Sequence, residues 1–304
     1  MLVQALAAAL VVAAAAYLLF NTLANLEARR IASGFAFLWR EAGFEIGESA
    51  GIAYGAANSY ARALAVGLAN TFKVAILGIV AATALGTLVG LGRLSPVFLL
   101  RNLSAGYVEF VRNVPLLVQL FFWYALITEG LPSPREALSP LPGVFLTNRG
   151  LFFPTFSGVP ELQGFNFAGG GALSPEFAAL WIGLSVYTAA FIAEIVRAGV
   201  MAVVRGQWEA ARAVGLSERH VLRYVIAPQA LRVVVPPLTS QYLNLTKNSS
   251  LAVAIGYPDL VSIANTTINQ TGQAIEGIAV IMAVYLSISL AISALMNWYN
   301  ARLR

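Results

Sequence analysis

The stretch RGQWEAARAVGLSERHVLRYVIAPQALRVVVPP, residues 205–237, is a hydrophilic island between apolar segments. Its first part predicts a short helix over residues 207–214, which Gly215 ends because glycine enters the left-handed conformation without a Cβ clash. Ser217 is placed to cap a second helix, which Pro228 ends or kinks because proline lacks a backbone N–H donor. Two small helices that meet at a glycine suit a lever that a soluble partner pushes.

The composition excludes a soluble domain with a polar surface. Of the 304 residues, 59% are hydrophobic and only 11% are charged, whereas about a quarter is usual in globular proteins. The chain has no cysteine, which excludes disulfides, thiolate catalysis and cysteine metal sites. The net charge of +5 comes from basic residues spread between apolar runs, so the positive-inside bias of membrane proteins explains it better than nucleic-acid binding does. We therefore expect a lipid bilayer and no nucleic acid as a partner.

Apolar runs predict six membrane-spanning helices, since about 20 apolar residues cross a hydrocarbon core. The predicted spans are residues 2–26, 63–91, 99–127 and 177–200, a fifth span that Pro236 and Pro237 introduce and residues 255–259 break, and residues 275–298. The first run could instead be a signal peptide. It is interpreted as a true span because no basic residue precedes it and because it is longer than a signal-peptide core.

Three segments outside the spans have expected structures of their own. Residues 35–39, in a stretch that mixes charges with aromatics, are typical of an amphipathic piece at the membrane interface. Residues 129–173 are rich in proline and glycine without a clear period, which predicts an extramembrane loop with little regular structure. A lid, a docking surface and a passive loop are all open as its role. Polar residues up to Gln273 predict an outer connection before the last span.

Charged and polar side chains inside the spans are candidates either for a transport path or for helix-to-helix contacts. Glu109 and Arg112 stand three residues apart, so that they share a helix face and can pair. The fifth span is unusually polar, and we expect its polar residues to face a cavity or neighbouring helices because exposure to lipid is costly. The candidates for the substrate path are Glu109, Arg112, Asn244, Lys247, Asn248 and Ser249.

Other residues of the spans have structural interpretations. Gly86 and Gly90 form a GxxxG spacing that lets a neighbouring helix approach closely. Lys73 is interpreted as reaching toward the outer interface rather than as a transport residue. Glu194 and Arg197 are predicted to form an ion pair at the cytoplasmic boundary.

The island resembles the EAA loop of ABC importer permeases, whose pattern is EAA, three residues, Gly, nine residues and Ile-x-Leu-Pro. This chain keeps the spacing, with two conservative departures, in Glu209, Ala210, Ala211, Gly215, Val225, Ala227 and Pro228. The segments FVRNVPLLVQLFFWY (residues 110–124), YTAAFIAEIVRAG (187–199) and PQALRVVVPPLTSQYLNLTKNSSLA (228–252) resemble the polar amino-acid branch of that family. The resemblance covers residues 63–127 and 174–298.

The resemblance implies an all-α membrane protein of six transmembrane helices. Its fold would be the type I ABC importer transmembrane domain, with one extra N-terminal helix and a long periplasmic insertion. Residues 1–61 would form the N-terminal helix and an interfacial segment, and residues 62–300 the permease domain. Within that domain, residues 129–173 would be the insertion and residues 205–235 the cytoplasmic coupling loop.

The resemblance also implies the energy source and the partners. The sequence has no GxxxxGK[ST] loop that could hold ATP phosphates, so this chain is expected to bind no cofactor and to be a transport subunit rather than an enzyme. Mg-ATP would be bound by a cytoplasmic ABC ATPase dimer. A periplasmic amino-acid-binding protein would deliver the substrate. The extra helix and the insertion resemble the general L-amino-acid permease subgroup, which implies a similar but distinct second permease subunit, while a homodimer stays open.

The ATPase would grip the coupling loop, and its closure would rock the spans from inward- to outward-facing. Glu209 would be the polar contact, Ala210 and Ala211 the small face for close docking, and Gly215 the joint, with Pro228 closing the motif. A polar-lined channel is an alternative, but it would not need an island shaped for an ATPase. A membrane-embedded enzyme would need titratable residues gathered at one depth, and here they are scattered.

The distribution of arginine supports a topology in which both termini lie on the cytoplasmic side of the bacterial inner membrane. With the island inside, the inner segments hold Arg93, Arg101, Arg197, Arg205, Arg212, Arg219, Arg223, Arg232, Arg302 and Arg304. The outer segments hold Arg29, Arg30, Arg40, Arg62, Arg135 and Arg149. The excess on the inner side has the sign of the positive-inside rule.

Overall fold

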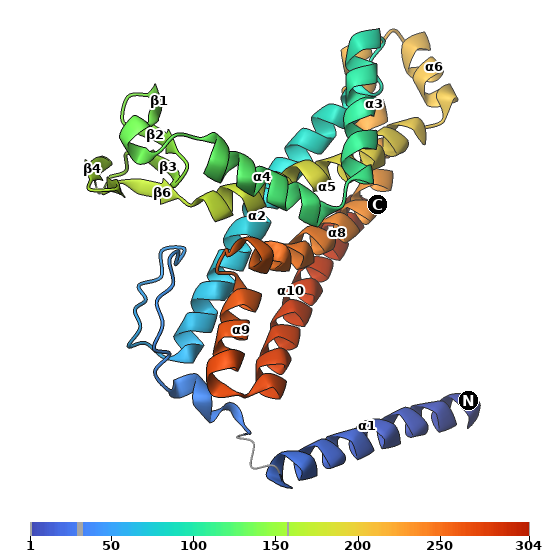
Figure 1. Ribbon diagram of the computed structural model, residues 1–304. Coiled ribbons are helices and arrows are strands. Elements are labelled where there is room, and N and C mark those ends of the chain that lie inside the picture. Colours follow the sequence, from blue (N-terminus) through green and yellow to red (C-terminus); the bar gives the residue numbers. More distant parts are fainter. Residues whose placement is uncertain (1, 29–32, 157, 304) are drawn as a thin grey trace.

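The apolar runs of the chain fold into long helices that form most of the molecule (Figure 1). The structure, a computed structural model, describes residues 2–28, 33–156 and 158–303, so Arg29, Arg30 and Arg304 lie outside the described residues. The α-helices are α1 Leu2–Ala28, α2 Tyr60–Gly92, α3 Phe98–Asn113, α4 Leu116–Gly130, α5 Pro175–Met201, α6 Arg205–Ala213, α7 Glu218–His220, α8 Ala227–Asn248, α9 Leu260–Thr271 and α10 Ala274–Leu303. Shorter helical turns are η1 Phe35–Trp39, η2 Pro134–Glu136, η3 Val221–Ile226 and η4 Ser249–Ile255.

Five helical stretches within the described residues are long and apolar enough to cross a membrane, or up to six if a bent pair counts as one span. They correspond to the six predicted spans, but the third is not one helix. Its halves α3 and α4 meet at 105°. The break lies at Val114 and Pro115, because the residue before a proline is driven out of the helical region and Val114 is extended.

The prolines of the fifth span do not act as the sequence suggested. Of the two effects predicted for Pro228, ending the helix is wrong: Pro228 lies in the first turn of α8, directly after the wide turn η3, where the regular helical ladder is disturbed. In that turn the Ala227 N–H bonds to the Leu222 carbonyl, five residues back, which accommodates the missing donor of Pro228. Pro236 and Pro237 lie inside α8 rather than at the start of the span. The stretch Glu218–Ile255 therefore forms one continuous helical span.

The connection predicted before the last span contains a helix, α9, which the sequence analysis did not predict. The Asp259 side chain caps it by accepting a hydrogen bond from the Ser262 N–H at 2.8 Å. Leu260, Ile263 and Ala264 are buried at helical spacing, and α9 packs against α2 and α10. The many Thr and Asn side chains of this segment interrupt its apolar pattern, so the sequence did not predict an amphipathic helix here.

The insertion at residues 129–173 contradicts the prediction of little regular structure. It holds β1 Leu138–Leu141, β2 Val144–Thr147, β3 Gly150–Phe153, β4 Glu161–Gln163, β5 Asn166–Ala168 and β6 Gly171–Leu173. The strands form an antiparallel sheet in the order β1-β2-β3-β6 and a separate β4-β5 hairpin. Phe145 and Phe167 stack with ring centroids 4.4 Å apart, which joins the hairpin to the sheet. Strands of three or four residues are too short to show a period in the sequence.

The aromatic segment at residues 35–39 is only partly interfacial. Phe37 is fully buried and packs edge-on against Tyr60 at the start of α2, with ring centroids 6.1 Å apart. Phe35 and Trp39 are exposed. This short turn therefore holds the chain before α2 against the helical bundle, whereas α1 lies apart from the bundle in Figure 1.

Helices α2 and α5 pack closely against each other through the predicted GxxxG spacing. A Cβ atom added at Gly86 would lie 2.7 Å from Ile192 Cβ and 2.8 Å from the Ala189 carbonyl oxygen. A Cβ atom at Gly90 would lie 2.7 Å from the Ala193 carbonyl oxygen. The two long spans can approach this closely only because both positions lack side chains.

We predict that Gly86→Leu lowers the stability of the purified protein by about 1–3 kcal/mol, because the new side chain overlaps the backbone of α5. The matched control is Gly106→Leu, since a Cβ atom at Gly106 meets nothing within 4 Å. The melting temperatures of both variants in one detergent check this. Equal melting temperatures would contradict the close contact.

Candidate coupling loop and substrate path

The hydrophilic island folds as two helices joined at a glycine, as predicted. Gly215 has a φ of +82°, so the backbone between α6 and α7 is left-handed there. No atom lies within 4 Å of a Cβ atom built on Gly215, so its requirement for glycine is conformational and not steric. In Figure 1, α6 lies at the end of the molecule opposite to α9.

The residues of the EAA motif point to different sides of α6. The Glu209 side chain is 63% exposed and pairs with Arg205 one turn earlier, N to O 3.0 Å. Ala210 is exposed. Ala211 is only 5% exposed, and it belongs to a small apolar cluster with Val221 and other residues of the island. Docking of a partner on Ala211 does not fit this burial, whereas Glu209 and Ala210 are accessible.

A charged pair closes the joint around Gly215. Arg212 donates to both carboxylate oxygens of Glu218, at 2.7 and 3.1 Å, across the glycine. The hydrogen bond from Arg212 lowers the pKa of Glu218 below its ordinary value. Ser217 does not cap α7 with its side chain as predicted. Its hydroxyl instead hydrogen-bonds His220 Nδ1 at 2.7 Å, and His220 is a solvent-exposed helix residue.

The island is tied to the ends of two spans. Gln229, in the first turn of α8, donates to the Gln207 side chain of α6 at 3.2 Å. Near the end of α5, a Cβ atom added at Gly199 would lie 2.2 Å from Val234 Cγ2, so α5 and α8 touch there without a gap. The island is therefore in contact with α8, which in turn packs against the end of α5.

An ion cluster joins α2 and α5 on the side of the island. Arg197 and Glu194 form the predicted pair, with Nη2 and Oε1 2.5 Å apart. Arg93, at the end of α2, pairs with the other carboxylate oxygen of Glu194. All three side chains are partly buried, so the cluster fixes to one another the ends of the two spans that lie nearest the island.

The candidate path residues of α8 divide into two groups. Asn244 and Lys247 are exposed on one helix face, and Asn248 beside them is half-buried. Ser249 is fully buried and its hydroxyl donates to the Thr246 carbonyl at 2.7 Å, which is a contact within the helix. The first group is thus available to a partner or substrate, and Ser249 is not.

The charged residues of α3 are not a pair. Glu109 and Arg112 are both exposed and form no ion pair with each other within the described chain. The Arg112 guanidinium instead lies over the Phe191 ring of α5, 5.0 Å from its centroid. Helices α3 and α8 both pack against α5. The candidate path residues of α3 and those of α8 therefore lie on two helices that contact the same third helix.

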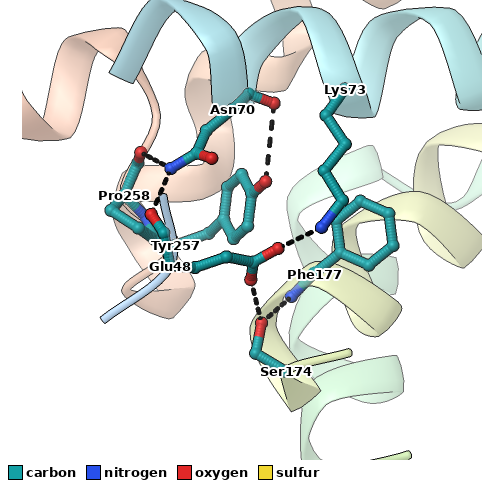
Figure 2. Close-up of polar contacts among 7 residues, drawn as sticks. All are labelled: Glu48, Asn70, Lys73, Ser174, Phe177, Tyr257 and Pro258. Atoms are coloured by element: carbon teal, nitrogen blue, oxygen red, sulfur yellow. Dashed lines mark hydrogen bonds and ion pairs between the residues drawn. The ribbon is translucent and has the colours of Figure 1, made fainter. Parts of the chain in front are cut away.

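A second charged cluster, which the sequence interpretation missed, lies at the start of α5, whereas Glu194 lies near the end of that helix (Figure 2). Lys73 pairs with Glu48, a residue of the loop before α2. The other carboxylate oxygen of Glu48 accepts a hydrogen bond from Ser174 Oγ at 2.6 Å, at the start of α5. The Lys73 ammonium also lies 4.1 Å from the centroid of the Phe177 ring. A lysine this deep in a span needs a partner, because an unpaired charge is costly there. The position of Lys73 in the predicted span is therefore the one sequence feature that pointed to this cluster.

Backbone contacts extend this cluster to the break before α9. Asn70 donates to the carbonyl oxygens of Glu48 and Pro258, at 2.7 and 2.9 Å (Figure 2). Further along the loop, Arg40 donates to Gln273, whose side-chain amide donates to the Gly34 carbonyl at 2.8 Å. We call residues 34–59 the outer strap, because they cross the ends of α2, α5, α9 and α10 on this side.

The membrane-spanning helices, the bent third span and the jointed island define the transmembrane domain of a type I ABC importer. The family described as "Binding-protein-dependent transport system inner membrane component" matches residues 82–304, and the chain belongs to this family. It is therefore a transport subunit of the bacterial inner membrane and not an enzyme, since separate ATPase subunits hydrolyse ATP in ABC importers. An ATPase and a binding protein are the partners that membership implies.

The relatives have amino-acid permease names. The putative amino-acid ABC transporter permease protein YhdX of Escherichia coli is 47% identical, over 99% of this chain and 93% of the relative. The general L-amino acid transport system permease protein AapQ of Rhizobium johnstonii is 43% identical, over 93% of this chain and 86% of the relative. A solved amino acid ABC transporter with histidines has a chain that is 27% identical with a TM-score of 0.61, covering 80% of this chain and 95% of that one.

We predict that Lys73→Met loosens the outer strap. The change leaves the Glu48 carboxylate, 15% exposed, without its counter-charge. Amide exchange at Ala42 and Gly43, which bond across the strap to Asn58 and Ala56, should become about tenfold faster, equivalent to about 1.4 kcal/mol.

The matched control is Lys247→Met, which removes an exposed lysine that has no ion pair among the described residues. Hydrogen exchange with mass spectrometry compares both variants with the parent. Unchanged exchange in the strap of Lys73→Met would show that the pair does not hold it.

Proposed function

We propose that this chain moves L-amino acids across the inner membrane by alternating access, as one of two permease subunits driven by a cytoplasmic ATPase dimer. A periplasmic binding protein delivers the amino acid at the outer face. The names of the two relatives support the substrate class. Because Mg-ATP is held by the ATPase, this chain binds no cofactor itself.

The observation that carries the proposal is the jointed island. Glu209 and Ala210 present an exposed docking face on α6, while Ala211 packs inward and holds α6 to the chain beneath it. Gly215 is the joint, and the wide turn before Pro228 links it to α8. Closure of the ATPase dimer presses on α6, and the contacts of α6 with the following helices transmit the movement to the spans.

The orientation of the chain in the membrane follows from the docking face on α6, because the ATPase that would contact this face is cytoplasmic. With the island in the cytoplasm, the insertion and the outer strap are periplasmic, and both termini are cytoplasmic. The second permease subunit is a similar but distinct chain, which is supported only by the resemblance of the extra N-terminal helix and the insertion to the general L-amino-acid subgroup. Its contact surface includes the exposed polar face of α8, since polar side chains are costly against lipid.

The substrate path runs along that polar face, between the two permease subunits. Asn244 and Lys247 are its contribution from α8, with Asn248 at its margin, because the first two side chains are exposed and the third is half-buried. A lysine ammonium is suited to the carboxylate that every amino acid carries. Glu109 and Arg112 on α3 are exposed and can contribute from a second helix.

We predict that Gly215→Val uncouples ATP hydrolysis from uptake. A left-handed conformation costs an L-residue about 1–2 kcal/mol, and a β-branched side chain tolerates it least. Uptake of labelled amino acids into vesicles that contain the complex should fall severalfold, while hydrolysis by the ATPase subunits continues.

Two control variants make this test specific. Gly215→Asn should keep most uptake because asparagine enters the left-handed region more readily. Gly206→Val adds the same side chain to α6 at a glycine without positive φ and with open space around it. Normal coupling in Gly215→Val would refute the joint, and uptake without ATP would refute the importer itself.

We predict that Lys247→Met lowers the rate of uptake about tenfold, since it removes one charge-assisted hydrogen bond to the passing carboxylate. Lys247→Arg keeps the charge and should restore part of the rate. The measurement is ATP-dependent uptake by the reconstituted complex with a panel of labelled amino acids. If Lys247→Met transports with unchanged rate and affinity, Lys247 does not belong to the path.

A further inference from the structure

Backbone hydrogen bonds close the corner between α6 and α7. The Gly215 N–H donates to the Arg212 carbonyl at 2.9 Å, and the Leu216 N–H donates to the Ala211 carbonyl at 3.3 Å. These two bonds form the Schellman motif, in which a left-handed glycine ends a helix and satisfies its last carbonyl groups. The backbone at Gly215 therefore has one defined conformation rather than the freedom of an open glycine loop.

A side-chain pair crosses the same corner. Arg212 donates from Nε and Nη2 to the two carboxylate oxygens of Glu218, at 2.7 and 3.1 Å. The guanidinium also lies over the Trp208 ring, 5.8 Å from its centroid. Two parallel hydrogen bonds fix the direction of a contact as well as its length. They join the last turn of α6 to the first residue of the continuous helical stretch Glu218–Ile255.

Helix α6 is attached to that stretch at two further places. At its start, the Gln207 side chain accepts a hydrogen bond from Gln229 of α8 at 3.2 Å. On its buried face, Ala211 belongs to an apolar cluster with Val221 and Ile226 of the wide turn η3. Hydrophobic contacts are non-directional, so the apolar cluster alone would let α6 rotate. The polar contacts on either side of the cluster hold α6 at one angle to the stretch that follows.

The exposure of the charged pair indicates a role in orientation rather than in stability. The Arg212 side chain is 52% exposed and the Glu218 side chain is 65% exposed. Exposed ion pairs contribute little to the stability of a fold. A bidentate pair across a corner acts instead on the angle between the two helices, because its geometry is satisfied at only one angle.

We propose that the corner at Gly215 stays closed during transport and that Arg212 and Glu218 are the positioning pair that holds its angle. This proposal rests on the proposed function. When the ATPase dimer displaces α6, the corner carries the following helical stretch with it, and bending occurs in the wide turn η3, where the helical ladder is irregular. Arg212 and Glu218 act through each other and not as contacts to the ATPase.

The first test reverses these charges in the reconstituted complex and measures labelled amino acid taken up per ATP hydrolysed. Arg212→Glu and Glu218→Arg each place like charges across the corner. Each should lower this ratio about threefold to fivefold, the population shift that one exposed pair can produce. The double variant restores opposite charges and should recover at least half of the parent ratio. The control is Arg219→Glu, which changes an exposed arginine of the island without an ion pair among the described residues and should leave the ratio unchanged.

A double variant no better than the single variants would overturn the pairing, because residues that contact the ATPase separately are not rescued by exchanging them. Parent ratios in both single variants would overturn the positioning role.

The second test fixes the corner covalently. The chain has no cysteine, so Arg212→Cys combined with Glu218→Cys gives it two thiols, which a short bis-maleimide joins across the corner. Mass spectrometry of peptides identifies the link within one chain. The linked complex should transport at least as well as the same variant labelled with a monofunctional maleimide. Loss of uptake only on linking would show that the corner must open, which overturns the proposal.

Amide exchange separates a failure of the pair from a failure of the proposed function, because it needs no transport. Exchange at Gly215 and Leu216, which donate the two bonds of the corner, should become faster in each single charge variant and return toward the parent in the double variant. Equal exchange in all four proteins would overturn the pair. Uptake by the parent complex without ATP would refute the proposed function instead.

Discussion

The glycine contact between α2 and α5 is the constraint on which the rest of the structure depends. Gly86 and Gly90 bring two long spans together so closely that a single methyl group would overlap the facing backbone. Both ends of this pair are then fixed by charge. Arg93 meets Glu194 at the end near the island, and Lys73 meets the strap and the start of α5 through Glu48 toward the opposite end. Helices α2 and α5 therefore behave as one body, around which the other spans are arranged.

The moving part, under the proposed function, is the helical stretch that begins after Gly215. From Glu218 to Asn248 the chain is helical without interruption and spans roughly 45 Å at 1.5 Å per residue. Its inner end is attached to α6 through Gln229 and Gln207, and its outer part carries Lys247. A continuous helix of this length, which we call the rod, would transmit a displacement of the island to the polar face of α8 as a rigid element. No series of side-chain rearrangements between the two would be needed. The wide turn before Pro228 is the place where the rod can bend.

Local patterns predicted the parts of this structure that depend on local physics. The spans follow from apolar runs, the joint from one glycine at a fixed spacing, and the Glu194–Arg197 pair from two residues three apart. Contacts between distant segments could not be found in this way. Glu48 and Lys73 are 25 residues apart in the sequence, and Ser174 follows 101 residues after Lys73. No local sequence pattern around these residues therefore predicts that they form one cluster. The short strands and α9 were missed because few buried positions define each of them.

The outer strap gives the N-terminal part of the chain a role beyond that of a membrane anchor. The family match begins at residue 82, so the strap with Glu48 lies before it, whereas its anchoring points on α5 and before α9 lie within it. An added segment that only anchored the chain would need no buried carboxylate between two spans, since burying a charge is costly unless it is paired. Because Glu48 is satisfied only when α2 and α5 keep their present spacing, the strap stabilises that spacing on the outer side. Under the proposed function, outward opening then involves α3, α4 and the rod, or first releases Glu48.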